Sequence, residues 1–181
     1  MTTDLLLSLT RRYLEPHRHY HSLEHVAAML HAGREFCLDD DQVMAVWFHD
    51  AIYDPRSETN EEDSAALASQ LLAANGWPAT AIARVRRIVL DTKLHEPTVD
   101  GSAAVLDLDL MSLALPWPEF HRNTERIRAE YAHVGDAEFR AGRAKFFAAM
   151  LRRPRLFFTP IGARLEAAAR ANLARANDLA R

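Results

Sequence analysis

Apolar residues in this chain recur every three to four positions over long stretches, and this spacing constrains the fold more than any other feature. Such a period places apolar side chains on one face of an α-helix, whereas a half-buried strand needs strict alternation. Alanine, a strong helix former, occurs 31 times and glycine six times. The pattern predicts an all-α fold with helices over residues 3–14, 22–36, 40–52, 60–75, 78–92, 102–115, 117–134, 136–152 and 160–180.

The length and composition fit a single folded domain. The chain has 181 residues, of which 49% are hydrophobic and 26% are charged. These values are close to the average for globular proteins. No internal repeat, low-complexity segment or long linker interrupts the sequence. We therefore expect one helical bundle of about eight or nine helices over residues 1–181.

Cysteine content and apolar runs bear on the location of the protein. The single cysteine, Cys37, excludes an internal disulfide framework and a Cys-based zinc finger. The stretch MTTDLLLSLTRRYL has none of the basic region, long apolar run and cleavage site of a signal peptide. No other apolar run is long enough for a membrane span. These features favour a cytoplasmic protein with no membrane partner.

Charge is unevenly distributed along the chain. Residues 140–181 carry ten Lys or Arg residues against Glu166 and Asp178, a net charge of +8, whereas residues 1–139 carry −11. Basic C-terminal helices that pack beside an acidic body explain this pattern, and attraction of a phosphate-bearing ligand is the alternative. The overall charge of −3 argues against nucleic acid as a partner.

Two predicted helix starts carry a capping signal. Thr59 precedes Glu62 by three residues, which is the capping-box pattern. Asp39 and Gln42 form a weaker version of the same pattern before the predicted helix 40–52. We expect the capping box at Thr59 to begin the helix that follows it.

Histidine is enriched, with nine residues in the chain. Four of them lie near one predicted helix start, at positions 17, 19, 21 and 25. On a helix, His21 and His25 share a face, so their rings could bind a cation or a phosphate together. We interpret His17 and His19, in the loop-like EPHRHY, as solvated.

The pair His49-Asp50 ends a predicted helix that is otherwise almost entirely apolar. An unpaired buried carboxylate costs several kcal/mol, so such a group is normally tied to a cation or to a hydrogen-bond network. Near a helix end, an imidazole nitrogen and a carboxylate oxygen can converge on one point, where a metal ion is the natural occupant. A capping aspartate with an incidental histidine is the alternative.

A second apolar helix contains two carboxylates, Asp107 and Asp109. Residues two apart on a helix point about 200° from one another, so both cannot face one site. The neighbours of Asp109 one turn away are bulkier than those of Asp107. This favours Asp109 as the carboxylate that faces the interior, with Asp107 as the alternative.

The order His25, His49-Asp50 and Asp109 in a helical chain resembles the H…HD…D signature of the HD superfamily of metal-dependent phosphohydrolases. Five phrases look like a subgroup of predicted HD phosphohydrolases of about this length. They are YHSLEHVAAML (20–30), VWFHDAIYDP (46–55), NEEDSAALA (60–68), TKLHEP (92–97) and LDLDLMSLA (106–114). The phrases span residues 20–114, and the C-terminal third matches only in being helical.

The resemblance implies an HD-type helical domain with a metal-site core at about 20–114 and basic C-terminal helices at about 117–181. It implies that His25, His49, Asp50 and Asp109 bind one divalent metal ion, and that Asp50 also takes part in catalysis. Two imidazoles and two carboxylates suit Mn, Fe, Co, Ni or Mg, with positions left open for water and substrate. The sequence lacks the extra histidine pair of some dinuclear HD enzymes, which favours one metal ion.

The resemblance also implies roles for residues outside the ligand set. Glu61 is expected to relay a proton or orient a water, and an acid favoured by the helix dipole is the alternative. His21, Lys93 and His95 are expected to bind the substrate phosphate, with solvated positions as the alternative. For His21, support of a second metal ion is a further alternative.

These interpretations predict an enzyme, a monomer or homodimer, that hydrolyses a small phosphate ester or anhydride such as a nucleotide. It would use a water activated by the metal ion. A non-catalytic helical module that binds a nucleotide or a partner and retains the metal site is the alternative function.

Overall fold

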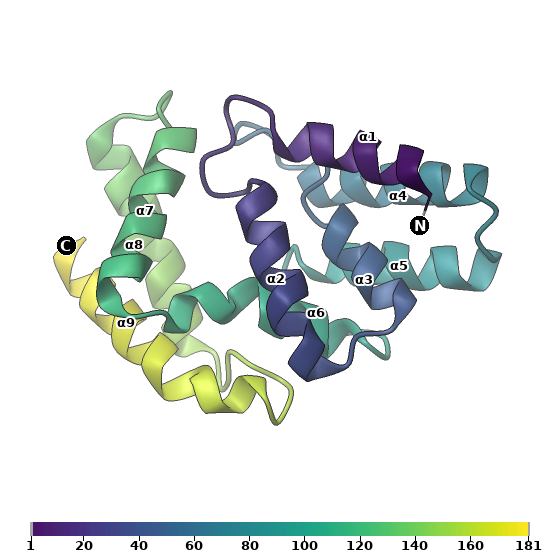
Figure 1. Cartoon of the computed structure of the whole chain (residues 1–181). Helices are drawn as coiled ribbons and strands as arrows, with labels where there is room; N and C mark the ends of the chain where they lie inside the picture. The colour runs from purple at the N-terminus through teal and green to yellow at the C-terminus, as the bar shows by residue number, and fades with distance from the viewer. Residues whose placement is uncertain (1, 181) are drawn as a thin grey trace. The chain divides into compact units, whose positions relative to one another are not determined.

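The computed structural model describes residues 2–180, which contain nine α-helices, two short 3₁₀ helices and no β-strand (Figure 1). The α-helices are α1 (Thr3–Tyr13), α2 (Leu23–Phe36), α3 (Asp40–Phe48), α4 (Asn60–Ala74), α5 (Ala79–Asp91), α6 (Ser102–Leu110), α7 (Trp117–Glu130), α8 (Asp136–Arg152) and α9 (Glu166–Leu179). The 3₁₀ helices are η1 (Met111–Ala114) and η2 (Gly162–Leu165). Over the described residues, none of the helices combines the length and the apolar character needed to cross a membrane. A cytoplasmic location stays a prediction.

The predicted all-α fold is confirmed, and the nine predicted helices correspond in order to α1–α9. The differences lie at helix ends. Helix α3 ends at Phe48 instead of residue 52, and α7 ends at Glu130 instead of residue 134. The predicted helix 102–115 is α6 followed by η1, and the predicted helix 160–180 is η2 followed by α9. Apolar periodicity does not distinguish the last turn of an α-helix from a tighter turn that follows it.

The two capping signals have opposite outcomes. Asp39 has the extended backbone of an N-cap, with φ −78° and ψ 172°, and forms a complete capping box with Gln42. Thr59 has φ −119° and ψ 16° and makes no capping bond to α4. Its hydroxyl donates instead to Oδ2 of Asp63, 2.9 Å away. The capping box predicted at Thr59 is therefore wrong, because its backbone lacks the extended geometry that directs an N-cap side chain toward the first N–H groups.

The chain divides into two compact units, Met1–Leu106 and Asp107–Arg181, and helix α6 runs through the boundary between them. In the first unit, α5 packs against α4 and α3, and α3 also packs against α2. Side chains with no exposed surface in this unit include Leu9, Val26, Met29, Phe48, Leu72, Ile88 and Val105. The single domain over residues 1–181 stays a prediction.

The start of α3 is fixed by Arg84 of α5. The guanidinium lies 2.8 Å from Oδ2 of Asp39 and 3.0 Å from Oδ2 of Asp41, and Nε donates to the carbonyl of Asp100 at 3.2 Å. Partial burial raises the pKa of Asp39, but hydrogen bonds from Arg84 and Gln42 outweigh burial and hold this pKa below its usual value. These contacts join α3, α5 and the loop before α6.

In the second unit, α9 packs against α8 and η1, and α7 packs against η1. The core of this unit contains Leu110, Leu113, Phe120, Phe147, Met150, Leu156, Phe157, Ala169, Leu173 and Ala176. Glu166, at the start of α9, accepts hydrogen bonds from the backbone N–H groups of Leu156 and Phe157 and pairs with Arg170 at 2.6 Å. A structural role for the basic C-terminal helices, without nucleic-acid binding, stays a prediction.

Candidate metal centre

The apolar helix α3 leads directly into the His49-Asp50 pair. The last five residues of α3, from Met44 to Phe48, are buried, and His49 follows as the C-cap residue with 1% of its surface exposed. Nδ1 of His49 lies 2.8 Å from the carbonyl oxygen of Val46. A carbonyl can only accept, so Nδ1 carries the proton and donates it. In the neutral ring, Nε2 then has the lone pair that binds metal ions.

The carboxylate of Asp50 lies beside that nitrogen. Oδ2 of Asp50 is 2.9 Å from Nε2 of His49, and 15% of the Asp50 side chain is exposed. With a neutral His49 ring, both atoms present lone pairs, so a contact this short requires a proton or a metal cation to hold them together. The end of α3 therefore carries one nitrogen and one oxygen donor on adjacent residues.

His25, in the first turn of α2, brings a second imidazole to this pair. Its backbone N–H donates to the carbonyl of Ser22, the N-cap residue, at 3.0 Å. Only 8% of His25 is exposed, and its ring centroid lies 5.3 Å from that of His49. The ring of Tyr20 also packs on His25, with centroids 5.2 Å apart. Burial and these aromatic contacts restrict the rotamer of His25.

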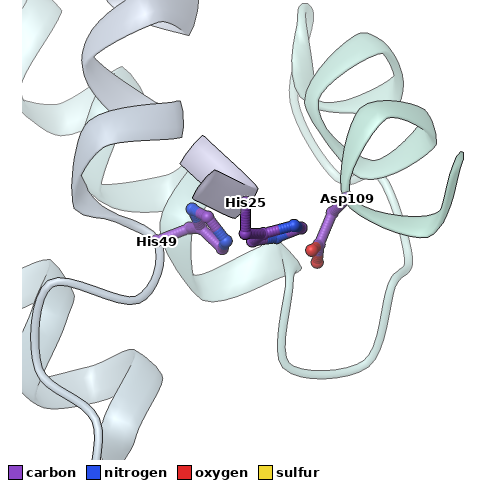
Figure 2. A group of neighbouring side chains, drawn as sticks. All are labelled: His25, His49 and Asp109. Carbon is purple, nitrogen blue, oxygen red and sulfur yellow. The ribbon is translucent and has the colours of Figure 1, made fainter. Parts of the chain in front are cut away.

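Asp109, in the last turn of α6, supplies a carboxylate to the two histidines. One potential ligand atom from each of His25, His49 and Asp109 lies within 4.8 Å of the others. Figure 2 shows the imidazole of His25 between the ring of His49 and the carboxylate of Asp109. We call these three residues the metal-ligand group. All three are among the four ligands that the HD resemblance implies.

Asp107, the alternative carboxylate, binds backbone groups instead. Its oxygens accept from the N–H of Phe158 at 2.7 Å, and from the N–H and hydroxyl of Thr159 at 2.8 and 2.7 Å. Burial raises the pKa of Asp107, and the hydrogen bonds from Thr159 and Phe158 oppose this rise. Of the two carboxylates, Asp109 is the one that lies with His25 and His49, although Asp107 is the more deeply buried: Asp107 has no exposed surface and Asp109 is partly exposed. The deciding donors lie about 50 residues away in sequence, so the bulk of neighbouring side chains cannot reveal them.

The donor set fits a divalent cation. An octahedral ion with bonds of about 2.1 Å holds neighbouring ligand atoms about 3 Å apart and opposite ones about 4.2 Å apart. The 2.9 Å between Nε2 of His49 and Oδ2 of Asp50 matches the first separation. The atoms of the metal-ligand group lie within 4.8 Å, so small side-chain movements bring them into the required range. Asp50 is not a member of this group and is linked to it by its contact with His49.

Glu61 and Lys93 both lie near the start of α4. Glu61 is partly buried in the first turn, where the helix dipole favours an acid. The ammonium of Lys93 lies 2.5 Å from Oε1 of Glu62 and 2.7 Å from the carbonyl of Glu58. The hydrogen bond with Glu62 raises the pKa of Lys93. Phosphate binding by Lys93 and a catalytic role for Glu61 stay predictions.

His21 and His95 lie outside helices. Helix α2 begins at Leu23, so His21 precedes it and does not share a helix face with His25, although the two ring centroids are 6.4 Å apart. The ring of His21 packs on Tyr53 with centroids 4.2 Å apart. His95 has φ 50°, a left-handed conformation that histidine adopts more readily than most residues. Phosphate binding by His21 and His95 stays a prediction.

The phrase NEEDSAALA has a structural role that the sequence did not reveal. Asn60 exchanges two hydrogen bonds of 2.9 Å with the backbone of Asp54. Ser64, four residues later and fully buried, accepts from the N–H of Ile52 at 3.0 Å and donates to the carbonyl of Ile52 at 3.2 Å. One face of α4 thus holds the backbone of the loop that follows the His49-Asp50 pair. The only sequence feature that indicates this role is the i, i+4 spacing of Asn60 and Ser64, which places two small polar side chains on one face of the helix.

We expect Ser64→Ala to destabilise the fold by about 1–3 kcal/mol, because it leaves two backbone groups of Ile52 without their partner. Ser69→Ala, on the same helix, is the matched control. Ser69 bonds only to the carbonyl of Ala65 within α4, so its replacement changes stability little. Urea unfolding of both variants measures the difference. Equal stability of the two variants would contradict the role of Ser64.

Comparison with protein-family models, curated proteins and solved structures gave no match to this chain. The resemblance to the HD superfamily therefore depends on the quoted phrases. The metal-ligand group is consistent with that resemblance, because it unites histidines and a carboxylate from three of those phrases.

Proposed function

We propose that this protein is a metal-dependent phosphohydrolase that acts on a small phosphate ester or anhydride, such as a nucleotide. The supporting observation is the convergence of His25, His49 and Asp109 within 4.8 Å. The three residues come from different helical segments far apart in sequence, and two of them are buried. Two imidazoles beside a carboxylate form a mixed nitrogen and oxygen donor set of the kind that divalent transition metals bind.

In this proposal, His25, His49, Asp50 and Asp109 hold one divalent ion, which lowers the pKa of a bound water and stabilises charge on a phosphoryl group. The hydrogen bond from Nδ1 of His49 to Val46 fixes the tautomer that presents Nε2 as a ligand. Two carboxylates and two neutral imidazoles balance the charge of a divalent cation. Glu61 is proposed to orient the attacking water or relay its proton.

Lys93, His95 and His21 are proposed to bind the substrate phosphate. Lys93 is exposed, so a phosphate can replace Glu62 as the partner of its ammonium without burying a charge. The imidazoles of His21 and His95 each have a ring N–H group that can donate a hydrogen bond to a phosphate oxygen. These three residues bind and orient the substrate, whereas the metal-ligand group and Asp50 hold the ion.

A phosphate-release screen tests the proposed activity. Nucleotides and sugar phosphates are incubated with the parent protein and with Mn²⁺, Co²⁺, Ni²⁺ and Mg²⁺ in turn. We expect metal-dependent phosphate release by the parent and none by His49→Ala, which lacks one ligand of the metal-ligand group. A parent protein that takes up metal through His49 but hydrolyses no substrate would contradict the enzyme and support the non-catalytic binding module.

A further inference from the structure

Carbonyl groups at the end of α3 and in the turn that follows it are bound by side chains from an earlier part of the chain. The last carbonyls of an α-helix have no partner within the helix and must find one elsewhere. The hydroxyl of Tyr13 donates to the carbonyl of Trp47 at 3.0 Å. The guanidinium of Arg18 donates to the carbonyls of Asp50 at 2.7 Å and Ala51 at 3.2 Å. The turn that carries the His49-Asp50 pair is thus held from outside its own helix.

Arg18 is a buried cation that also contacts an acid and two aromatic rings. Its side chain has 0% exposure, and Nε lies 2.9 Å from Oε2 of Glu15. Its guanidinium carbon lies 5.1 Å from the ring centroid of Tyr13 and 5.5 Å from that of Tyr53. A cation removed from water destabilises a fold unless it is paired and hydrogen-bonded. Arg18 meets this condition with an acid, backbone carbonyls and two aromatic rings.

Arg18 also connects the segment that leads into α2. Nη1, the same nitrogen that binds the carbonyl of Asp50, donates to the carbonyl of His21 at 3.1 Å. His21 lies two residues before α2 begins, and His25 is in the first turn of that helix. A planar guanidinium fixes the direction of each N–H, so one side chain sets the separation between the two backbone segments.

We propose that Arg18 is a positioning residue for the metal centre. It holds the turn of His49 and Asp50 and the entry to α2 at the separation at which the ligands on both segments bind one ion. This inference depends on the proposed function. Arg18 acts through the ligands, because its buried N–H groups are directed at carbonyls and at Glu15.

Arg84 provides a matched control at the other end of α3. Each arginine makes four hydrogen bonds within the first unit. Arg84 binds the start of α3, and Arg18 binds the turn that follows α3. Arg84 contacts Asp39 and Asp41 at the start of the helix, eight or more residues before His49, and its four hydrogen bonds do not include the turn of His49 and Asp50. Replacement of Arg84 therefore measures how much stability is lost when an arginine with four hydrogen bonds is removed from this unit.

Titration with Co²⁺ tests the proposal, because the visible absorption of the bound ion reports its ligands independently of activity. The proteins compared are the parent, Arg18→Met, Arg18→Lys, Arg84→Met and His49→Ala, each checked for helical content by circular dichroism. We expect Arg18→Met to bind Co²⁺ about 10–100-fold more weakly with a changed spectrum, as is typical when a group behind a metal ligand is removed. Arg18→Lys keeps the charge without the planar fork and is expected to show a smaller loss.

Arg84→Met is expected to retain the Co²⁺ affinity and spectrum of the parent even if it unfolds at a lower temperature. Should Arg18→Met fail to fold, Arg18→Lys decides the question. Parent-like Co²⁺ affinity and spectrum in every folded Arg18 variant would overturn the positioning role while leaving the metal centre intact. A parent whose Co²⁺ binding is absent or unaffected by His49→Ala would overturn the proposed function, and the inference with it.

Discussion

Asp109→Asn is expected to abolish metal uptake with little change in stability, whereas Asp107→Asn is expected to leave metal uptake in place and destabilise the fold. Asp109 is partly exposed and contributes to the metal-ligand group. Loss of its negative charge is expected to weaken metal binding by at least about 100-fold. Removing a residue that only hydrogen-bonds to a metal ligand weakens binding by up to about 100-fold, and loss of a ligand itself has a larger effect.

Asp107 is fully buried and accepts three hydrogen bonds from Phe158 and Thr159. In Asp107→Asn, an NH₂ group replaces one of the two carboxylate oxygens. The buried N–H or hydroxyl donors that this oxygen accepted from then have no acceptor. Each such loss costs about 1–3 kcal/mol, and we expect a total destabilisation of about 2–5 kcal/mol.

Metal content and urea unfolding of the same two preparations check this prediction. If Asp107→Asn loses the metal while Asp109→Asn keeps it, Asp107 is the ligand and Asp109 is not. If both variants keep the metal and the stability of the parent, Asp109 is not a ligand and the hydrogen bonds of Asp107 do not stabilise the fold.

Asp50→Ala is expected to lose metal and activity together, whereas Lys93→Ala and His95→Ala are expected to lose activity alone. Removal of Asp50 takes away the carboxylate 2.9 Å from Nε2 of His49, so the neighbouring donors bind a cation more weakly and ligand-linked thermal stability falls. Lys93 and His95 are assigned to the substrate. Loss of one charge-stabilising group there is expected to reduce turnover by roughly ten- to a thousand-fold.

Metal stoichiometry and initial rate are measured on the same preparations of these three variants, with the substrate that the screen identifies. Loss of the exposed Lys93–Glu62 ion pair has little effect on stability, so unfolding does not obscure the result. Parent-like metal content and activity in Asp50→Ala would contradict its assignment as a ligand. Parent-like rates in both Lys93→Ala and His95→Ala would show that other groups bind the phosphate.

The helical fold could be predicted from the sequence because alanine is abundant, glycine is rare, and apolar residues recur every three to four positions in much of the chain. The ends of the helices were harder to predict from the sequence, as the end of α3 shows. The side chain of His49 bonds to Val46, and Arg18 binds the carbonyls of Asp50 and Ala51. These contacts lie at the point where α3 ends, and two of them come from 32 or 33 residues away, so local apolar spacing does not predict them.

The candidate site could be predicted only in part from the sequence. His49 and Asp109 stand out because titratable residues interrupt apolar helices, and His25 stands out through the histidine cluster and the HD resemblance. Arg18 does not stand out, since an arginine among histidines in a short loop has the same local sequence whether it is solvated or buried. Ser64 was equally hidden, because its two bonds to Ile52 cross from one helix to a loop.

The metal content of the purified chain tests the central claim most directly. The parent protein and His49→Ala are incubated with Mn²⁺ or Co²⁺, freed of unbound metal by gel filtration and measured by elemental analysis. We predict about one divalent ion per chain in the parent and almost none in His49→Ala. The variant loses the imidazole that belongs to the metal-ligand group and also contacts Asp50. A parent without metal after reconstitution, or a His49→Ala variant that retains it, would contradict the metal centre.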